Sequence, residues 1–591
     1  MTRSTLRPLL ASVVAALALV VAACGGSDSG SSTGSSSSGG GASASQETGG
    51  KQGGVLKQLG STDVDYLDPG HTYYTAGYQV LYPTQRTLYS FKPDNSTDPV
   101  PDLAASKPEI SSDLKTITVK IRPGVKFSPP VNRAVTSKDV KYAFERFFSV
   151  NVGGQYASYF SSIEGAPSAP TKGVKPISGI TTPDDQTIVF KLKEPQAVGV
   201  ASALVMPITA PVPEEYASKF DAKNPSTYNT HVVATGPYMV KNDAQGNTVG
   251  YQAGKSIDLV RNPNWDKSTD YRPAYLDEIQ LTTNESDASI AAQQVLTGSH
   301  LALDTNPPAA QLKDAVTNRK GQFVQLPGGG YRYFPLNTTI KPLDNINVRK
   351  AIIAAFDRDA ALKARGGKFT GDIPTHFLPP GIPGFEEAGG MAGPGYDFLK
   401  NPRGDMTVAA NYMKKAGYPS GKYTGTDNLL LVTSNADPGK SQAQVAQAQL
   451  EKLGLKITLR TVPQDSMYTE WCQVPGKQVA ICGDAAWFKD FLDPQSMLEV
   501  TFKGSNIVKS GGNNNLAQLD DKQVDAAMDK ATGLQGAARL DAWGNVDKMI
   551  TATAAAVPLV WDKTTLIWSK DVNGVANEYY DTIDFAYTSL K

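Results

Sequence analysis

The sequence predicts an α/β protein with two or three domains, on two local patterns and on its length. Residues 117–121 alternate apolar and polar side chains, which is the period of a half-buried strand. Residues 442–460 combine a helical pattern, a single glycine at position 454 and an alternating segment, the αβ half of a wound α/β unit. About 540 of the 591 residues follow the N-terminal segments, enough for two or three domains with their own cores.

Capping signals and apolar spacing predict two further helices. The first starts at a capping box formed by Thr136 and Asp139. Its apolar residues fall at helical spacing on one face: Val140, Ala143, Phe144 and Phe147. The second helix covers residues 348–355, and we expect both apolar faces to be core. Residues 250–256 look briefly like a phosphate-binding loop, but their glycines are one residue too close, so they predict a hairpin turn.

The N-terminus predicts export. Arg3 and Arg7 precede an apolar run over residues 9–21 that is too short to span a bilayer, which is typical of a signal peptide covering residues 1–23. The run ends in Val-Ala-Ala-Cys-Gly, which resembles the bacterial lipobox and predicts lipid attachment to Cys24. The alternative is an ordinary secretory cleavage site that happens to have a cysteine beside it. Residues 24–52 are rich in glycine and serine and predict a flexible tether.

Charge and motif content exclude several function classes. Without Arg3 and Arg7, 55 lysines and arginines face 57 aspartates and glutamates, so there is no basic excess for nucleic acid or anionic lipid. The four histidines are far apart and form neither a HExxH pair nor a zinc-ligand spacing. Outside the glycine- and serine-rich segment that follows Cys24, no GxSxG elbow appears in the sequence. We therefore expect no catalytic activity, no metal site and no cofactor.

Two cysteines remain after Cys24. Cys472 and Cys482 predict one disulfide closing a short loop, because the protein is expected outside the cytoplasm. The alternative is a pair of free buried thiols, since spacing alone does not bring two sulfurs together.

Several segments, in this order, resemble the family 5 solute-binding proteins of ABC importers, which include oligopeptide-, dipeptide- and nickel-binding proteins. The most specific block covers Pro101–Ala104, Lys120–Phe127 and Thr136–Val140. The resemblance continues through further matches at 234–238, 261–265, 274–279, 347–352, 416–418 and 493–494. It spans nearly everything after Gly53.

The resemblance implies a two-lobed periplasmic-binding-protein type II fold with an extra subdomain on the first lobe. The first lobe would hold residues 53–330 plus 555–591, with the subdomain near 91–205. The second lobe would hold residues 331–554. Gly328–Gly330 and Val557–Val560 would be the two strand crossings, since glycines absorb the backbone changes of a hinge cheaply. An ordinary loop between domains is the alternative for the three glycines. Asp493-Pro494 is interpreted as a turn.

The resemblance also implies a site. In peptide-binding relatives an aspartate in a Trp-x-x-Asp stretch holds the ligand's α-ammonium, and here Trp487 and Asp490 occupy that stretch. Trp487 would supply an apolar wall. The alternative for Asp490 is a solvated loop aspartate that pairs with Lys489. The alternative for Trp487 is an ordinary core residue.

These expectations combine into a monomeric, non-enzymatic lipoprotein. It would capture short peptides between its lobes, on the outer face of the cell membrane, and deliver them to ABC permease subunits. The same fold binding an oligosaccharide, an opine or a metal chelate is one alternative. A lipid-anchored enzyme or adhesion protein is the second.

Overall fold

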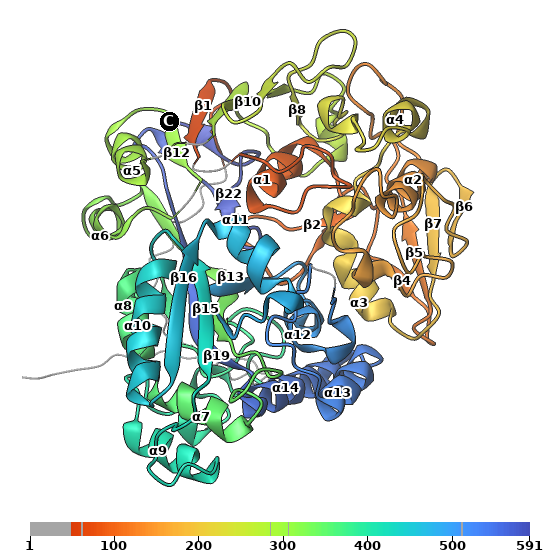
Figure 1. The fold of residues 1–591 in the computed structure, drawn as a ribbon. Coiled ribbons are helices and arrows are strands. Elements are labelled where there is room, and N and C mark those ends of the chain that lie inside the picture. The colour runs from red at the N-terminus through yellow and green to blue at the C-terminus, as the bar shows by residue number, and fades with distance from the viewer. Residues whose placement is uncertain (1–48, 61–62, 284, 286, 305, 510–511) are drawn as a thin grey trace, which may run out of the picture. The chain divides into compact units, whose positions relative to one another are not determined.

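The computed structural model describes residues 49–591 apart from 61–62, 284, 286, 305 and 510–511 (Figure 1). The predicted signal peptide, Cys24 and nearly all of the predicted tether lie outside the described residues. Among the helices that are described, none is both long enough and apolar enough to cross a membrane.

The first part of the described chain forms a six-stranded sheet. Its strand order is β12-β1-β11-β10-β8, and β9 pairs with β10. Its strands are β1 (Val55–Leu59), β8 (Tyr238–Val240), β9 (Tyr251–Gln252), β10 (Ser256–Arg261), β11 (Glu278–Thr282) and β12 (Leu301–Leu303). The helices from the same part of the chain are α1 (Thr75–Thr84), α4 (Glu214–Asp221), α5 (Ala288–Thr297) and α6 (Ala309–Asn318). Antiparallel pairing of β9 with β10 confirms the predicted hairpin turn.

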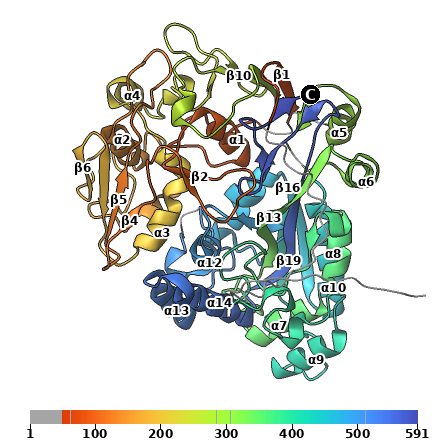
Figure 2. The same cartoon turned by 180° about the vertical axis from the view of Figure 1, so that it is seen from behind.

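A separate four-stranded antiparallel sheet has the order β4-β5-β7-β6. Its strands are β4 (Glu109–Ile110), β5 (Thr116–Lys120), β6 (Ile180–Asp184) and β7 (Thr187–Lys191), and α2 (Ser137–Phe147) and α3 (Ala197–Ser202) belong to the same region (Figures 1 and 2). The predicted strand and the helix after the capping box are both confirmed. The backbone N–H of Thr136 donates to the Asp139 carboxylate at 2.7 Å, which satisfies one of the unpaired donors at the start of α2.

The α/β unit predicted near residue 450 is also confirmed. β15 (Asn428–Ser434) runs parallel to β16 (Lys456–Val462) and β17 (Ile481–Cys482), and α10 (Gly439–Lys452) connects the first two. Gly454 makes the tight turn with φ +84°, and an added Cβ would lie 2.4 Å from the carbonyl oxygen of Tyr423. α7 (Ile346–Ala355) confirms the second predicted helix, and α8 (Arg358–Arg365) and α9 (Met406–Lys415) follow it.

Two long strands connect the cores of these regions. β13 (Phe323–Pro335) and β19 (Ala556–Ile567) pair antiparallel, with β14 (Gly371–Asp372) and β18 (Ala485–Phe488) on their outer edges. The register breaks between Pro327 and Tyr331, so the three glycines form an irregularity inside β13 rather than a loop. Before the break β13 packs with the six-stranded sheet, and after it β13 packs with residues of the later α/β region. On β19 the same change falls after Trp561, a few residues beyond the predicted crossing at Val557–Val560.

Helices complete the C-terminal half. They are α11 (Gln464–Ser466), a π-helix (Met467–Cys472), α12 (Pro494–Phe502), α13 (Lys522–Thr532) and α14 (Gly536–Thr553). Short pairs of strands are formed by β2 (Tyr89–Ser90) with β3 (Val100–Pro101), β20 (Val572–Asn573) with β23 (Ser589–Leu590), and β21 (Ala576–Asn577) with β22 (Thr582–Ile583).

The interpretation of Asp493-Pro494 as a turn is wrong. Pro494 is the first residue of α12, and the Asp493 carboxylate caps the helix by accepting from the N–H of Gln495 at 2.9 Å. Proline suits this position because the N–H it lacks would be unpaired there in any case. Arg539 forms a buried ion pair with both carboxylate oxygens of Asp493, at 2.8 and 2.9 Å.

Candidate functional site

Asp490 lies in a short connection between β18 and α12. The connection is fixed at both ends: the N–H of Lys489 donates to the carbonyl of Gly329 at 3.1 Å, and Asp493 caps α12. The hydroxyl of Tyr579 also donates to the backbone carbonyl of Asp490 at 3.2 Å. The backbone that carries the predicted site residue is therefore held by three different parts of the chain.

Two tyrosine hydroxyls hold the Asp490 side chain. Tyr73, just before α1, donates to one carboxylate oxygen at 2.8 Å, and Tyr159 donates to the other. Asp490 belongs to the later α/β region, whereas both tyrosines come from the first 160 residues. These two hydrogen bonds join segments far apart in the sequence, and Phe491, next to Asp490, packs in the same hydrophobic cluster as both tyrosines.

The electrostatics of Asp490 follow from this environment. Burial raises the pKa of its carboxyl to about 6, and the hydrogen bonds from Tyr159 and Tyr73 oppose that rise only in part. Burial, together with the neighbouring Asp490 charge, raises the pKa of both phenols well above their usual range. Asp490 therefore has two neutral donors and, within the part of the chain that the structure describes, no ion-pair partner, an arrangement that an ammonium group complements.

Lys489 does not pair with Asp490. Its ammonium forms an ion pair with Asp581 at 3.0 Å, and burial raises the pKa of Asp581 to about 6. The sequence alternative of a solvated, lysine-paired Asp490 does not describe this structure, because its side chain is half-buried and bonded to phenols.

A cavity of about 460 Å³ lies beside these groups. This volume falls within the usual range for small-ligand sites. Its walls come from residues 73–74, residues 155–159, β13, the segment 465–473, β18, α12 and residues 512–516. Seven aromatic side chains line it: Tyr73, Tyr74, Tyr156, Tyr159, Tyr333, Tyr468 and Trp487. Asp490 is not a lining residue itself, but both of its phenol partners are.

Trp487, the second predicted site residue, lines this cavity. Its indole N–H donates to the backbone carbonyl of Ser496 in α12 at 2.7 Å, which fixes the ring. The side chain is partly exposed and not a fully buried core residue.

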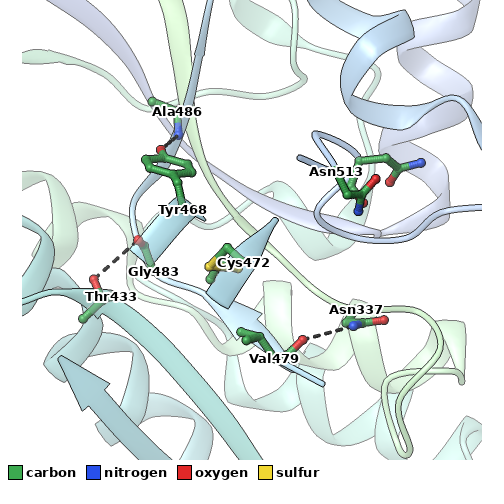
Figure 3. The surroundings of a disulfide bond; sticks show 10 residues. Asn337, Thr433, Tyr468, Cys472, Val479, Gly483, Ala486 and Asn513 are labelled. Carbon is green, nitrogen blue, oxygen red and sulfur yellow. Dashed lines mark hydrogen bonds between the residues drawn. A yellow bond between two sulfur atoms is a disulfide. The ribbon is translucent and has the colours of Figure 1, made fainter. Parts of the chain in front are cut away.

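The disulfide stiffens the same wall. Cys472 and Cys482 are bonded, which joins the end of the π-helix to β17 (Figure 3). The π-helix carries Tyr468, whose hydroxyl accepts a hydrogen bond from the N–H of Ala486 in β18 at 3.0 Å (Figure 3). Short π-helical segments are rare and occur frequently at functional sites.

The sequence interpretation missed Tyr73 and Tyr159. They lie 417 and 331 residues from Asp490, and neither belongs to a motif that links it to the Trp-x-x-Asp stretch. Nor does any group of three or more histidine, cysteine or acidic side chains within the described residues have the geometry to hold a metal ion.

A concave aromatic cavity beside a half-buried carboxylate is suited to binding a small solute. The family model for bacterial extracellular solute-binding proteins, family 5, matches residues 98–509. The chain belongs to this family. Family members bind solutes outside the cytoplasm and are not enzymes.

Similar proteins agree with this assignment. Heme-binding protein A of Haemophilus influenzae is 28% identical over 476 residues, which cover 78% of each chain. The oligopeptide-binding protein OppA of Bacillus subtilis is 27% identical over 414 residues, covering 69% of this chain and 70% of the relative.

Solved structures show the same fold. Clavulanic acid biosynthesis oligopeptide binding protein 2 superposes with a TM-score of 0.79 at 26% identity, over 91% of this chain and 96% of that one. The Helicobacter pylori periplasmic binding protein DppA in complex with the peptide STSA gives a TM-score of 0.72 at 22% identity, over 91% and 98%. The fold is that of the type II periplasmic binding proteins, as the resemblance implied.

Proposed function

We propose that this protein binds short peptides through their N-terminal ammonium and delivers them to an ABC permease. The observation that carries the proposal is the half-buried Asp490 carboxylate, which lies beside an aromatic cavity and has no basic partner among the described residues. The N-terminus is the one cation that all free peptides share. Trp487 and the tyrosines would supply apolar and aromatic walls for the rest of the ligand.

The proposed domain organisation serves this function. Residues 53–330 with 555–591 form the first lobe, including a subdomain near 91–205, and residues 331–554 form the second. Support comes from the change of core along β13 and β19. Ligand contacts that differ between open and closed states would favour closure of the lobes.

The proposed location is the outer face of the cell membrane, with lipid on Cys24 after removal of residues 1–23. Residues 24–52 would be the tether that keeps a monomeric binding protein near its permease. The lipobox-like sequence and the glycine- and serine-rich composition support this part of the proposal.

The test compares free and N-acetylated forms of the same peptides by calorimetry. Acetylation should weaken binding by about 1.5–3 kcal/mol, the range for hydrogen bonds to charged groups. Asp490→Asn should weaken the free peptide by a similar amount and abolish the difference between the two forms.

Asp581→Asn is the matched control, because Asp581 is a neighbouring buried carboxyl with a similar pKa of about 6 that faces Lys489 instead. This variant should keep the preference for the free N-terminus. Equal affinity of wild-type protein for free and acetylated peptides would contradict the role given to Asp490.

A further inference from the structure

Among the described residues, the charged side chains that line the cavity or bond to its lining tyrosines are acidic. Asp465 lines the cavity, and Asp490 is bonded to two of its lining tyrosines. Among the described residues, no lysine or arginine lines it. A peptide carboxylate inside this cavity would therefore lose its water without gaining a cation.

Several basic side chains from segments beside the lining residues already have carboxylate partners. Lys489 pairs with Asp581 at 3.0 Å, and Arg539 pairs with Asp493 at 2.8 Å. Lys503 contacts both Glu499 and Asp529, at 2.6 and 2.7 Å. Recruiting any of these cations to a ligand would leave a carboxylate without its partner, which is costly for the buried pairs.

One side of the cavity is exposed to solvent, and the other side is half-buried. Its exposed lining residues include Tyr74, Ser158, Asp465 and Thr469, whereas Tyr73 and Tyr159, which hold Asp490, are half-buried. After burial, the charge of Asp465 is the largest contribution that raises the pKa of Tyr74, so these two rim residues lie near each other.

We propose that the site recognises a ligand through its cationic end alone. This proposal rests on the peptide-binding function above and narrows its substrate class. The ammonium lies inward at Asp490, the chain leaves past the rim at Tyr74 and Asp465, and the C-terminal carboxylate stays in water. Peptide amides and longer peptides are then ligands as good as short peptide acids.

Asp465 adds a preference for basic side chains of the ligand at the rim of the cavity. A lysine or arginine side chain beyond the first residue of the ligand meets its carboxylate, whereas an acidic side chain meets repulsion. Because Asp465 is exposed, water and salt screen this interaction, so the preference amounts to only a few-fold and declines as salt rises.

The experiment uses random tri- to pentapeptide libraries synthesised as acids, as C-terminal amides and as N-acetylated acids. The purified protein is mixed with equal amounts of all three, and retained peptides are weighed by mass spectrometry. We expect amides to be retained as well as acids or better, and acetylated peptides to be depleted about tenfold or more. An enrichment of acids over amides of about tenfold would overturn the inference, because that is the effect of a cation on the carboxylate.

The two proposals fail differently. If acetylated peptides are retained as well as free ones, or no library is retained, the proposed function falls, whatever the ratio of amides to acids. If acetylated peptides are depleted and acids exceed amides, only the present inference falls.

Asp465→Asn tests the rim. Its side chain is exposed, so the substitution removes a charge without disturbing a core. Peptides with lysine should lose their few-fold advantage over matched peptides with glutamine. A lysine preference that stays unchanged in this variant would overturn the assignment of Asp465.

Discussion

Asp490 differs from the neighbouring Asp493 and Asp581 because no lysine or arginine among the described residues pairs with it. Asp493 is paired with Arg539, and Asp581 with Lys489. Asp490 has only the hydroxyls of Tyr73 and Tyr159. Its charge is thus stabilised by neutral dipoles, and burial places its pKa at about 6, within reach of an ordinary environmental pH change.

Peptide binding should therefore weaken in acid. Below its pKa of about 6 the Asp490 carboxyl is mostly neutral in the ligand-free protein, while the peptide ammonium stays charged. Lowering the pH from 7 to 5 should weaken binding of a free peptide about tenfold, since about one molecule in ten is ionised one unit below the pKa. Calorimetric titrations across this range measure the effect.

The direction of this pH dependence and its origin in Asp490 can both be checked. The affinity should rise with pH through about 6 and level off near 7, because a raised aspartate pKa leaves the charged form only above that value. Asp490→Asn should show a nearly flat profile over the same range. A flat profile in the wild-type protein would exclude a carboxylate contact to the ligand.

The sequence could predict Asp490 and Trp487 only by resemblance to relatives, because a short Trp-x-x-Asp stretch has no local signature of a binding site. Tyr73 and Tyr159 could not be found at all. A tyrosine whose hydroxyl reaches a partner hundreds of residues away has the same local pattern as any tyrosine.

At the scale of elements, the π-helix and β17 hold one wall of the cavity. The disulfide between Cys472 and Cys482 fixes the distance between them, while Tyr468 from the π-helix and Trp487 from β18 line the wall. Tyr468 is bonded to the N–H of Ala486 in β18, so a shift of the π-helix would move β18 as well.

Replacing both Cys472 and Cys482 by serine should lower stability and affinity together. Opening a loop of this length removes about 2–3 kcal/mol of stabilisation on a chain-entropy model. Because the loosened segment carries cavity residues, peptide affinity should also drop several-fold. Thermal unfolding and calorimetry measure the two effects.

Reduction provides the control. Dithiothreitol should reproduce both changes in the wild-type protein and do nothing further to the serine variant. Unchanged peptide affinity in the serine variant would mean that the disulfide supports the fold but not the cavity wall.

Helices and strands whose apolar residues recur at a regular spacing could be predicted from the sequence. The strand at β5, the helices α2, α7 and α10, and the step from α10 into β16 all follow from side-chain spacing and one glycine. The segment at Asp493-Pro494 was not, because an aspartate before a proline is common both in turns and at the start of a helix. In this chain Asp493 caps the helix that begins at Pro494, and its buried contact with Arg539 holds it there.

At the scale of the whole molecule, β13 and β19 are the long strands that share residues with both sets of cores. Neither the pairing of strands more than 200 residues apart nor the change of core along them has a local sequence signal. The family resemblance alone predicted two strand crossings, at Gly328–Gly330 and at Val557–Val560. The glycines at 328–330 mark the crossing on β13 as an irregularity in the ladder.

The contacts of Asp490 with Tyr73 and Tyr159 have a consequence at this scale. They join the two proposed lobes through side chains alone, next to the cavity. In the ligand-free protein these bonds should favour the closed arrangement, and a bound ammonium would add its own contact with Asp490. The open and closed populations then depend on a few kcal/mol.

The double variant Tyr73→Phe, Tyr159→Phe should therefore shift the ligand-free protein toward an open form. It removes two hydrogen bonds to a charged group, of about 1.5–3 kcal/mol each, and keeps both rings in place. Small-angle X-ray scattering should report a larger radius of gyration than for the wild type, and saturating peptide should restore the wild-type value. Tyr74→Phe is the matched control, because Tyr74 lines the same cavity at its exposed rim and its hydroxyl has no contact with Asp490. If the double variant scatters like the wild type with and without peptide, the phenol contacts do not govern closure, and another surface must hold the lobes together.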